Sequence, residues 1–342
     1  MGVDLYSLFS GKQITIEQLK GKTIALDAHL VIYQFLSTIR GPDGMLLLDS
    51  KGRPTSHLQG IFSRGMKLLE LGVNLCFVFD GEPPELKRGV LEARKQAKHV
   101  AQVQLEEARE KGDLEAIKRY SQRTSFLTKE MIAEAKELIL AMGIPVVEAP
   151  SEAEAEAAHL VKIKKAYAVG TQDADAFLFG APRIIKNLTV SGRRRVPNTK
   201  SYMEVFPEIF ELETVLRELK ISQDQLIALG MLSGTDYSPK GIPDIGPKKA
   251  LKLVVEHKEN FDALFSSVEW NKHQANSWET IFDAFKNIPV SDFDLKFKKI
   301  DQDKIREILC EQHDFSNERI VGILEKFNKS NAHNQEGLSK WF

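Results

Sequence analysis

Short apolar runs alternate with helix-like segments through the first half of the chain. Three of the runs have the length and composition of strands, and each ends on aspartate: Thr23 to Leu26 before Asp27, Leu75 to Phe79 before Asp80, and Tyr167 to Thr171 before Asp173 and Asp175. Segments with helical periodicity follow the first run to about Ile39 and precede the second to about Leu71. This alternation predicts an α/β fold with a mostly parallel twisted sheet flanked by helices.

The strand ends predict where ligands bind. The carboxyl ends of parallel strands lie on one edge of a sheet, so Asp27, Asp80, Asp173 and Asp175 are expected to converge there. Neighbouring carboxylates repel by about 1 kcal/mol per pair in water and by roughly 4 kcal/mol near a protein surface. Hard divalent cations, which prefer oxygen ligands, would relieve this repulsion. The alternative is that each aspartate occupies an ordinary turn after a strand.

Two further acidic segments have both a structural and a functional interpretation. Ser151-Glu152-Ala153-Glu154 has the spacing of a helix capping box, and a regular helix would put Glu152 beside Glu156 rather than beside Glu154. Asp236 follows an apolar helix-like segment and fits a helix-ending loop. It is the neighbouring aspartates that favour a metal-binding role for Glu152, Glu154 and Asp236.

Residues 82–132 form a charged insertion between two strand-like runs. Eleven Lys or Arg and nine Asp or Glu lie between Glu82 and Glu130, in a pattern that predicts long helices. Lys87, Arg94 and Lys98 are spaced i, i+7 and i+11, which places them on one helix face. A solvated helix of mixed charge is the alternative to a basic contact surface.

The architecture changes near residues 210–220, beyond which the sequence is almost wholly helical. We predict an α/β core over residues 1–218, a helical region over 219–328 and a flexible polar tail over 329–342. Between two helices, Gly241 and Gly246 would let backbone amides approach a phosphate, and Lys248 and Lys249 open the next helix, whose dipole favours anions. An ordinary interhelical turn is the alternative.

The composition narrows the class of protein without selecting a partner. Hydrophobic residues make up 42% of the 342 residues and charged residues 28%, as in ordinary soluble globular proteins. Because the net charge is −1, a nucleic-acid surface requires segregated basic residues. Two cysteines argue against a disulfide framework or a cysteine zinc site and fit a reducing intracellular compartment. No apolar run approaches the length of a membrane span.

Five motifs along the chain match a known family. They are Met1-Gly2-Val3-Asp4-Leu5, Ile24-Ala25-Leu26-Asp27-Ala28, Val78-Phe79-Asp80-Gly81-Glu82-Pro83-Pro84, Ala149-Pro150-Ser151-Glu152-Ala153-Glu154-Ala155 and Gly234-Thr235-Asp236-Tyr237. The chain resembles the flap endonucleases in these motifs, collinearly from residue 1 to about 330. The resemblance implies a PIN-like 5′ nuclease fold, in which residues 82–132 are a helical arch and residues 219–328 contain a helix-two-turn-helix.

The resemblance also implies a metal site. It assigns two Mg²⁺ ions per chain, which Mn²⁺ can replace, to seven carboxylates: Asp27, Asp80, Glu152, Glu154, Asp173, Asp175 and Asp236. Two metals about 4 Å apart can stabilise the attacking and the leaving oxygen of an in-line displacement at phosphorus.

The same resemblance implies roles for residues near the expected metal site. Lys87 and Arg94 match cationic residues that contact the scissile phosphate, and Tyr33 matches an aromatic residue on which a base stacks. Arg40 and Arg64 match positions near the substrate. The arch is expected to pass a single-stranded 5′ end.

The predicted helix-two-turn-helix departs from the family at one point. Its implied DNA-binding residues are Gly241, Gly246, Lys248 and Lys249, with a potassium ion bound at the turn. Pro243-Asp244 stands where related sequences usually carry Lys-Gly. This departure brings a carboxylate close to the expected phosphate and potassium positions.

The chain ends in a possible partner motif. Gln335 to Phe342 has the form Q-x-x-L-x-x-aromatic-aromatic and resembles the sliding-clamp (PCNA) binding peptide of replication proteins. The residues that match the named positions of this motif are Gln335, Leu338, Trp341 and Phe342. In a single 3₁₀ turn, Leu338 and Trp341 lie on the same side and form an apolar plug. The alternative is a polar tail that happens to end in two aromatics. Ending at this motif resembles the archaeal members, which implies a cytoplasmic, nucleoid-associated protein.

These observations lead to one hypothesis and two alternatives. We expect a monomeric structure-specific 5′ flap endonuclease, with 5′ exonuclease activity, that acts on branched DNA in Okazaki-fragment maturation and repair and has no membrane partner. The alternatives are a related 5′ nuclease with gap, exonuclease or repair-incision specificity, and a non-catalytic clamp-bound DNA scaffold.

Overall fold

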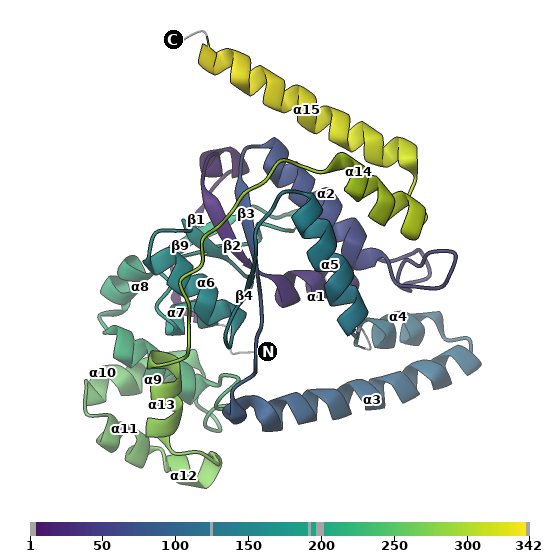
Figure 1. The fold of residues 1–342 in the computed structure, drawn as a ribbon. Helices are drawn as coiled ribbons and strands as arrows, with labels where there is room; N and C mark the ends of the chain where they lie inside the picture. Colours follow the sequence, from purple (N-terminus) through teal and green to yellow (C-terminus); the bar gives the residue numbers. More distant parts are fainter. Residues whose placement is uncertain (1–4, 124–125, 191–192, 196–201, 340–342) are drawn as a thin grey trace.

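A seven-stranded sheet forms the centre of the molecule (Figure 1). The computed structural model describes residues 5–123, 126–190, 193–195 and 202–339. The strand order is β1-β9-β6-β5-β2-β3-β4. The strands are β1 (Lys12–Gln13), β2 (Thr23–Asp27), β3 (Asn74–Phe79), β4 (Val146–Glu148), β5 (Ala168–Gly170), β6 (Arg183–Lys186) and β9 (Glu208–Glu211). Neighbours from β6 to β4 are parallel, whereas β9 and β1 run antiparallel to their neighbours, so the predicted mostly parallel sheet is confirmed.

Both faces of the sheet are buried because side chains alternate along each central strand. In β2, Ala25 joins one apolar cluster, whereas Ile24 and Leu26 join the other. The second cluster is covered by α1 (Ala28–Thr38), α2 (Ser56–Glu70) and α5 (Lys129–Ala141). The first is covered by α6 (Ala153–Lys162), α7 (Asp175–Leu178) and the helices that follow β9. The sheet is therefore sandwiched between helices, which leaves its carboxyl edge as the place for a site.

The predicted charged insertion is a pair of packed helices that projects from this edge (Figure 1). A 3₁₀ turn at Glu85–Lys87 leads into α3 (Arg88–Glu110), and α4 (Leu114–Arg123) returns along it. The end of α4 that returns to the core is bound to the loop after α1. Arg40 Nη2 donates to the Ser121 carbonyl at 3.0 Å, and Ser121 Oγ donates to the Gly44 carbonyl at 3.0 Å. The hairpin is thus anchored at both ends.

The predicted helical region 219–328 divides into two parts in space. Around the interhelical turn lie α8 (Leu212–Leu219), α9 (Gln223–Ser233), α10 (Pro247–His257), α11 (Phe261–Ser267), α12 (Trp270–His273) and α13 (Trp278–Lys286). Residues 287–301, all described, contain neither helix nor strand and run back across the molecule (Figure 1). Next come α14 (Gln302–Arg306), a π-helical turn (Glu307–Gln312) and α15 (Asn317–Ser339), which pack on α2 and α5 because their apolar residues join that cluster.

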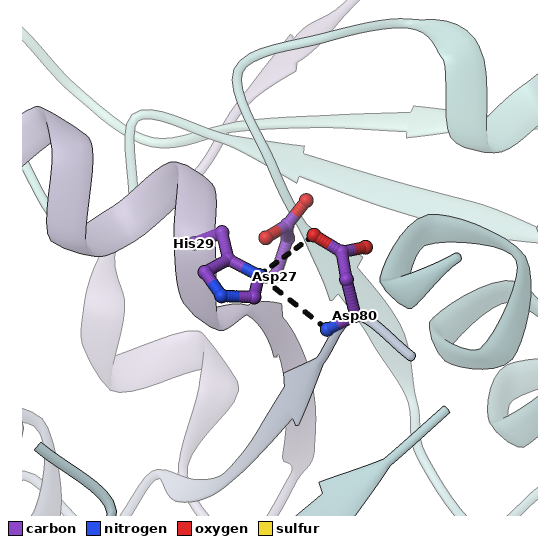
Figure 2. A group of neighbouring side chains, drawn as sticks. All are labelled: Asp27, His29 and Asp80. Carbon is purple, nitrogen blue, oxygen red and sulfur yellow. Dashed lines mark hydrogen bonds and ion pairs between the residues drawn. The ribbon is translucent and has the colours of Figure 1, made fainter. Parts of the chain in front are cut away.

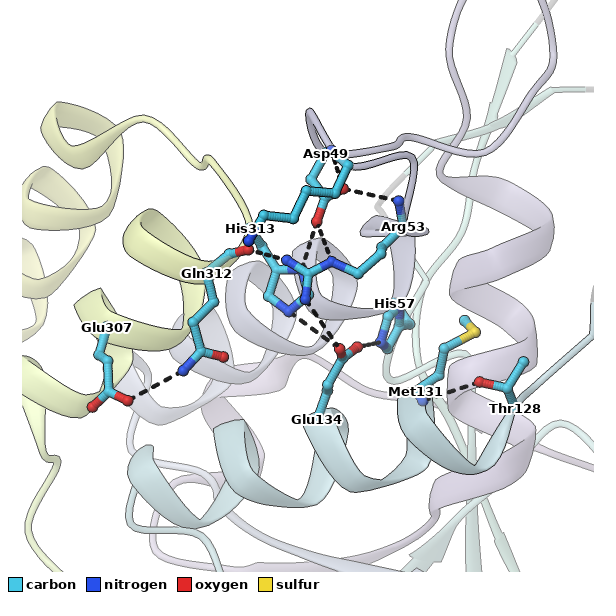
Figure 3. Close-up of polar contacts among 10 residues, drawn as sticks. Asp49, Arg53, His57, Thr128, Met131, Glu134, Glu307, Gln312 and His313 are labelled. Carbon is cyan, nitrogen blue, oxygen red and sulfur yellow. Dashed lines mark hydrogen bonds and ion pairs between the residues drawn. The ribbon is translucent and has the colours of Figure 1, made fainter.

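A polar cluster fixes this returning segment to the core (Figure 3). Asp49 Oδ2 lies 2.8 Å from Arg53 Nε and 3.2 Å from His313 Nδ1. Glu134 Oε1 lies 3.4 Å from His313 Nε2, and Glu134 Oε2 lies 3.6 Å from His57 Nε2. Although burial disfavours its charge, hydrogen bonds from Arg53 and its neighbours hold the pKa of Asp49 at about 2. Three distant parts of the chain are joined here by a polar cluster in which the side chains of Asp49, His57 and His313 are shielded from water.

The described part of the predicted tail over 329–342 lies in α15, which continues to Ser339, and its flexibility remains a prediction. Ile320 and Leu324 are buried against the core, and Ser330 Oγ donates to the Glu70 carbonyl at 3.2 Å. Once a helix is nucleated by such packing, each added residue gains a hydrogen bond, and no proline interrupts the segment. Within the described part of the chain, no helix combines the length and apolarity needed to cross a membrane.

Candidate metal and nucleic-acid site

A cavity of about 560 Å³ opens at the carboxyl edge of the sheet, beneath α3. All seven carboxylates predicted from the sequence line it: Asp27, Asp80, Glu152, Glu154, Asp173, Asp175 and Asp236. Lys87, Arg94 and Tyr33 line it as well. The structure therefore brings together side chains from strand ends, helix starts and the helical hairpin. The carboxylates farthest apart in the chain, Asp27 and Asp236, are 209 positions apart.

Two strand ends place the first pair of carboxylates. Asp27 is the last residue of β2 and the N-cap of α1, where its carboxylate accepts a hydrogen bond from Leu30 N at 2.9 Å. Asp80 follows β3, and its Oδ1 accepts from Ala153 N at 2.8 Å. Because Ala153 begins α6, the Asp80 carboxylate satisfies an amide at that helix terminus. Both carboxylates are thus held by backbone groups rather than by flexible partners.

The capping-box interpretation of Ser151 and Glu154 is wrong. Helix α6 begins at Ala153 with Glu152 as its N-cap, and Glu152 makes no side-chain capping bond. Ser151 Oγ instead donates to the Glu82 carbonyl at 3.3 Å. Since Glu152 has extended backbone (φ −95°, ψ 134°), helical spacing does not apply between it and Glu154, and both side chains reach the cavity. Glu156 points elsewhere and accepts from Ser291 N at 2.9 Å.

Asp173 and Asp175 reach the cavity by a different route from the predicted one. Strand β5 ends at Gly170, so the two aspartates do not share a strand face, and Asp175 is the first residue of α7. The intervening turn is held by a hydrogen bond from Asp173 N to Thr171 Oγ1 at 3.1 Å. The position of Asp173 is further fixed by Tyr6 Oη, which donates to its carbonyl at 2.9 Å.

The two predicted catalytic cations contact carboxylates directly. Lys87 Nζ lies 2.7 Å from Glu152 Oε1 and 3.3 Å from Asp236 Oδ2. Arg94 Nη2 lies 2.5 Å from Asp236 Oδ1. Burial opposes a charged Lys87, but Glu152 and Asp236 raise its pKa above the ordinary value. Both cations therefore lie directly against carboxylates of the cavity.

Charge crowding raises the pKa of the most buried carboxylates. Burial, followed by the charge of Asp80, raises the pKa of Asp27 to about 7. Burial, followed by the charge of Asp173, raises that of Asp175 to about 7, and burial together with Asp175 raises that of Glu154 well above its usual value. Without a cation, this part of the site tends to hold protons. The donor set is dominated by oxygen, so the residues present fit hard divalent cations.

One member of the site was missed by the sequence prediction. His29, on the first turn of α1, places Nδ1 2.7 Å from Asp80 Oδ2 and lines the same cavity (Figure 2). Burial lowers the pKa of His29, but its hydrogen bond to Asp80 and the charges of Asp80 and Asp27 outweigh this and raise it. The available signal was its spacing, two residues beyond the strand-end Asp27.

The predicted stacking residue, Tyr33, already has a cationic partner. Lys98 Nζ lies 4.7 Å from the centre of the Tyr33 ring and donates to Tyr33 Oη at 3.2 Å. The spacing of Lys98 with Lys87 and Arg94 had placed all three on one helix face, and all three line the cavity. The basic face of α3 is therefore turned toward the carboxylates.

Neither Arg40 nor Arg64 lines this cavity in the described structure. Arg40 holds the end of the helical hairpin through Ser121, as described above, and also donates to the Gly44 carbonyl at 2.9 Å. Arg64 is half-buried on α2, where burial lowers its pKa. The predicted substrate contacts of these two arginines remain predictions.

The predicted helix-two-turn-helix joins α9 to α10. Gly241 has φ +58°, and a Cβ at this position would lie 2.3 Å from the Leu232 carbonyl oxygen. Gly246 is the N-cap of α10 and has open space around it. Lys248, Lys249 and Asp244 are exposed at the same end of the helix. Opposite charges thus flank the N-terminus of α10.

The clamp-like motif falls partly outside the described structure. Gln335 and Leu338 lie within α15, which extends to Ser339. Trp341 and Phe342 lie beyond the described residues.

Comparisons with known proteins agree with this architecture. Residues 3–101 match the XPG N-terminal domain, and residues 143–236 match the XPG I-region. The chain is 44% identical to flap endonuclease 1 of Thermococcus onnurineus over 344 residues, covering 100% of this chain and 99% of the relative. It is 46% identical to flap endonuclease 1 of Thermofilum pendens over 347 residues, with the same coverage.

Solved structures of related nucleases share this fold. Flap endonuclease-1 from Methanococcus jannaschii superposes with a TM-score of 0.74 at 37% identity, covering 97% of this chain and 100% of the other. The catalytic core of Rad2 in complex with DNA substrate superposes with a TM-score of 0.69 at 26% identity, covering 96% and 100%.

Proposed function

Because this chain belongs to the flap endonuclease family, we propose that it is a structure-specific nuclease that cuts branched DNA at the base of a 5′ flap and also degrades 5′ ends. The observation that carries this proposal is the single cavity in which seven carboxylates face the basic side of α3. A scaffold that only binds DNA would gain nothing from carboxylates that repel it.

The carboxylates would hold two divalent cations, with Mg²⁺ as the proposed metal and Mn²⁺ as a substitute. When bound, such cations make a water easier to deprotonate and stabilise charge on the attacking and leaving oxygens. Asp27 and Asp80 would contribute oxygens from carboxylates that accept from backbone amides, and Glu152 and Asp236, which contact Lys87 in this structure, would contribute others.

The protein's own cations then act on the substrate. Lys87 and Arg94, released from Glu152 and Asp236, contact the scissile phosphate and stabilise its developing negative charge. Tyr33 offers its ring to the adjacent base, which requires Lys98 to move from the ring to a backbone phosphate. The hairpin of α3 and α4 admits a single strand to this position.

Other surfaces select the substrate. The amides at Gly241 and Gly246, with Lys248 and Lys249, would bind the backbone of the duplex beside the flap, together with a potassium ion at the turn. Asp244 weakens this contact by charge repulsion. Residues 335–342 would bind a sliding clamp, and the nuclease acts as a monomer in replication and repair.

Cleavage of a labelled 5′-flap duplex tests the proposal. Wild type is incubated with Mg²⁺ or with a chelator, beside Asp175→Ala and the control Asp262→Ala, an exposed carboxylate on α11. We expect cutting at the junction by wild type and control in Mg²⁺, and none by Asp175→Ala or in chelator. An intact flap, equal cutting by Asp175→Ala, or cutting in chelator contradicts the proposal. Gapped and blunt duplexes in the same assay separate the flap preference from related specificities.

A further inference from the structure

We propose that the imidazole of His29 is a nitrogen ligand to the divalent metal held by Asp27 and Asp80, and that it shifts the preference of this position from Mg²⁺ toward Mn²⁺ and related transition metals. The inference rests on the proposed metal-dependent function, but it concerns which metal the chain selects rather than whether it needs one.

Three donor atoms from three elements converge at this position (Figure 2). One atom each from Asp27 at the end of β2, His29 on α1 and Asp80 after β3 lie within 4.8 Å of one another. Donors bound to one cation at about 2.1 Å are separated by roughly 3 to 4 Å, so small side-chain movements suffice to enclose a metal. The ring of His29 is held for this role by an edge contact with Phe79, with centroids 5.6 Å apart.

The contacts of Nδ1 favour a cation between His29 and Asp80. Nδ1 lies 2.7 Å from Asp80 Oδ2, a contact that needs a proton on Nδ1, and 3.4 Å from Asp80 N, whose N–H needs a lone pair there. One neutral imidazole cannot satisfy both partners at once. The shorter contact places a proton between Nδ1 and Asp80 Oδ2. A metal ion bound by both atoms would take the place of that proton.

The nitrogen distinguishes this position from the rest of the cavity. The remaining carboxylates supply oxygen alone; they are Glu152, Glu154, Asp173, Asp175 and Asp236. Mg²⁺ prefers an octahedron of oxygen ligands, whereas transition metals also bind imidazole. The affinity of such a site for divalent transition metals increases from Mn²⁺ to Cu²⁺. The two metals of the proposed centre would therefore differ in identity when both kinds are present. The competing role for His29 is to position Asp80 through the hydrogen bond alone.

Electron spin echo envelope modulation of bound Mn²⁺ separates these roles. The full chain is loaded with Mn²⁺ and compared with His29→Ala and with the control His159→Ala. In the wild type, His159 lies on α6 outside the cavity, and its imidazole Nε2 lies 2.8 Å from Asp292 Oδ1. We expect the ¹⁴N coupling of a directly bound imidazole in wild type and control, and its loss in His29→Ala. Wild type labelled with [¹⁵N]histidine should show the corresponding ¹⁵N coupling, which keeps the test independent of any variant's folding.

Metal affinity provides the second measurement. By competition with a chelating dye, we expect His29→Ala to raise the Mn²⁺ dissociation constant by about tenfold and the Mg²⁺ constant by less than about twofold. Bound Mn²⁺ without nitrogen coupling, or equal losses for both metals, overturns the His29 assignment and leaves the nuclease proposal intact. Flap cleavage in chelator overturns the proposed function instead, and a wild type that binds no Mn²⁺ overturns both.

Discussion

Arg94 and Asp236 form a direct ion pair, with Nη2 2.5 Å from Oδ1, although they are 142 positions apart in the chain. The pair joins the helical hairpin to the loop after α9. Lys87 contacts the same carboxylate from the base of the hairpin. Lys87 and Arg94 therefore offset part of the negative charge of the acidic cluster. Under the proposed function, substrate phosphate and metal ions would take these partners over, which would couple metal binding to the approach of DNA.

Replacing Arg94 should slow the chemical step. We expect Arg94→Gln to lower the single-turnover rate on a 5′ flap by about 10²- to 10³-fold, the cost of losing one donor to a developing anion, while flap binding changes little. Rapid-quench cleavage and fluorescence anisotropy measure the two quantities. Arg88→Gln is the matched control, because Arg88 is an exposed arginine on the same helix that pairs with Glu85. Equal rates for Arg94→Gln and wild type would contradict the assignment.

The two glycines of the interhelical turn should respond differently to alanine. Gly241→Ala forces a Cβ to within 2.3 Å of the Leu232 carbonyl at positive φ, so we expect the free energy of unfolding to fall by more than about 2 kcal/mol. Gly246→Ala meets open space, and we expect a change within about 0.5 kcal/mol. Urea unfolding compares them. If Gly246→Ala proves as destabilising as Gly241→Ala, the steric explanation fails.

Acid should weaken the attachment of the C-terminal segment through Asp49. The folded pKa of Asp49 is about 2, below its ordinary value of 3.8, so its contribution to stability is complete above about pH 4 and disappears as the pH falls toward 2. We expect Asp49→Asn to be less stable than wild type at pH 6, with the difference narrowing between pH 4 and 2. Thermal unfolding across this range measures it. A difference that does not vary with pH would exclude the ionised contact with Arg53 and His313.

Neutralising Asp27 should stabilise the protein when metal is absent. Its folded pKa of about 7 exceeds the ordinary 3.8, so the folded state binds the extra proton and its stability falls as the pH rises from about 4 to 7. We expect metal-free Asp27→Asn to melt at least about 2 °C above wild type at pH 8, with little difference at pH 4. The amide retains the acceptor for Leu30 N. Adding Mg²⁺ should stabilise wild type more than the variant; the opposite order would argue against Asp27 as a ligand.

Removing residues 335–342 should separate clamp binding from catalysis. We expect the truncated chain to cut flaps at the wild-type rate alone, because the deleted segment contains none of the seven carboxylates and neither Lys87 nor Arg94. Stimulation by a cognate sliding clamp should be lost. Rates measured with and without the clamp provide the test, and unchanged stimulation would exclude this segment as the attachment.

Local sequence patterns predicted the scaffold well. The alternation of Ile24, Ala25 and Leu26 between two buried faces reflects strand periodicity, and the aspartates at the strand ends follow from parallel topology. The same reasoning was less reliable at Glu152, where a capping motif suggested a helix start one position too early. The residue at which a helix begins depends on which side chain accepts from its first backbone amides. In α6 that side chain is Asp80, 73 positions before Ala153, which accepts from Ala153 N.

The sequence by itself determined the alternation of strands and helices, the aspartates at the strand ends and the basic face of α3, because these depend on periodicity and on contacts a few residues apart. The rest of the acidic set came from the resemblance to a known family. Only the tertiary structure showed that His29 faces Asp80, that Arg94 pairs with Asp236, and that His313 and Asp49 fasten the last helices to the core. It also showed that the described part of the predicted tail continues α15. Such contacts join residues 51 to 264 positions apart, so they depend on how buried surfaces pack rather than on any local preference.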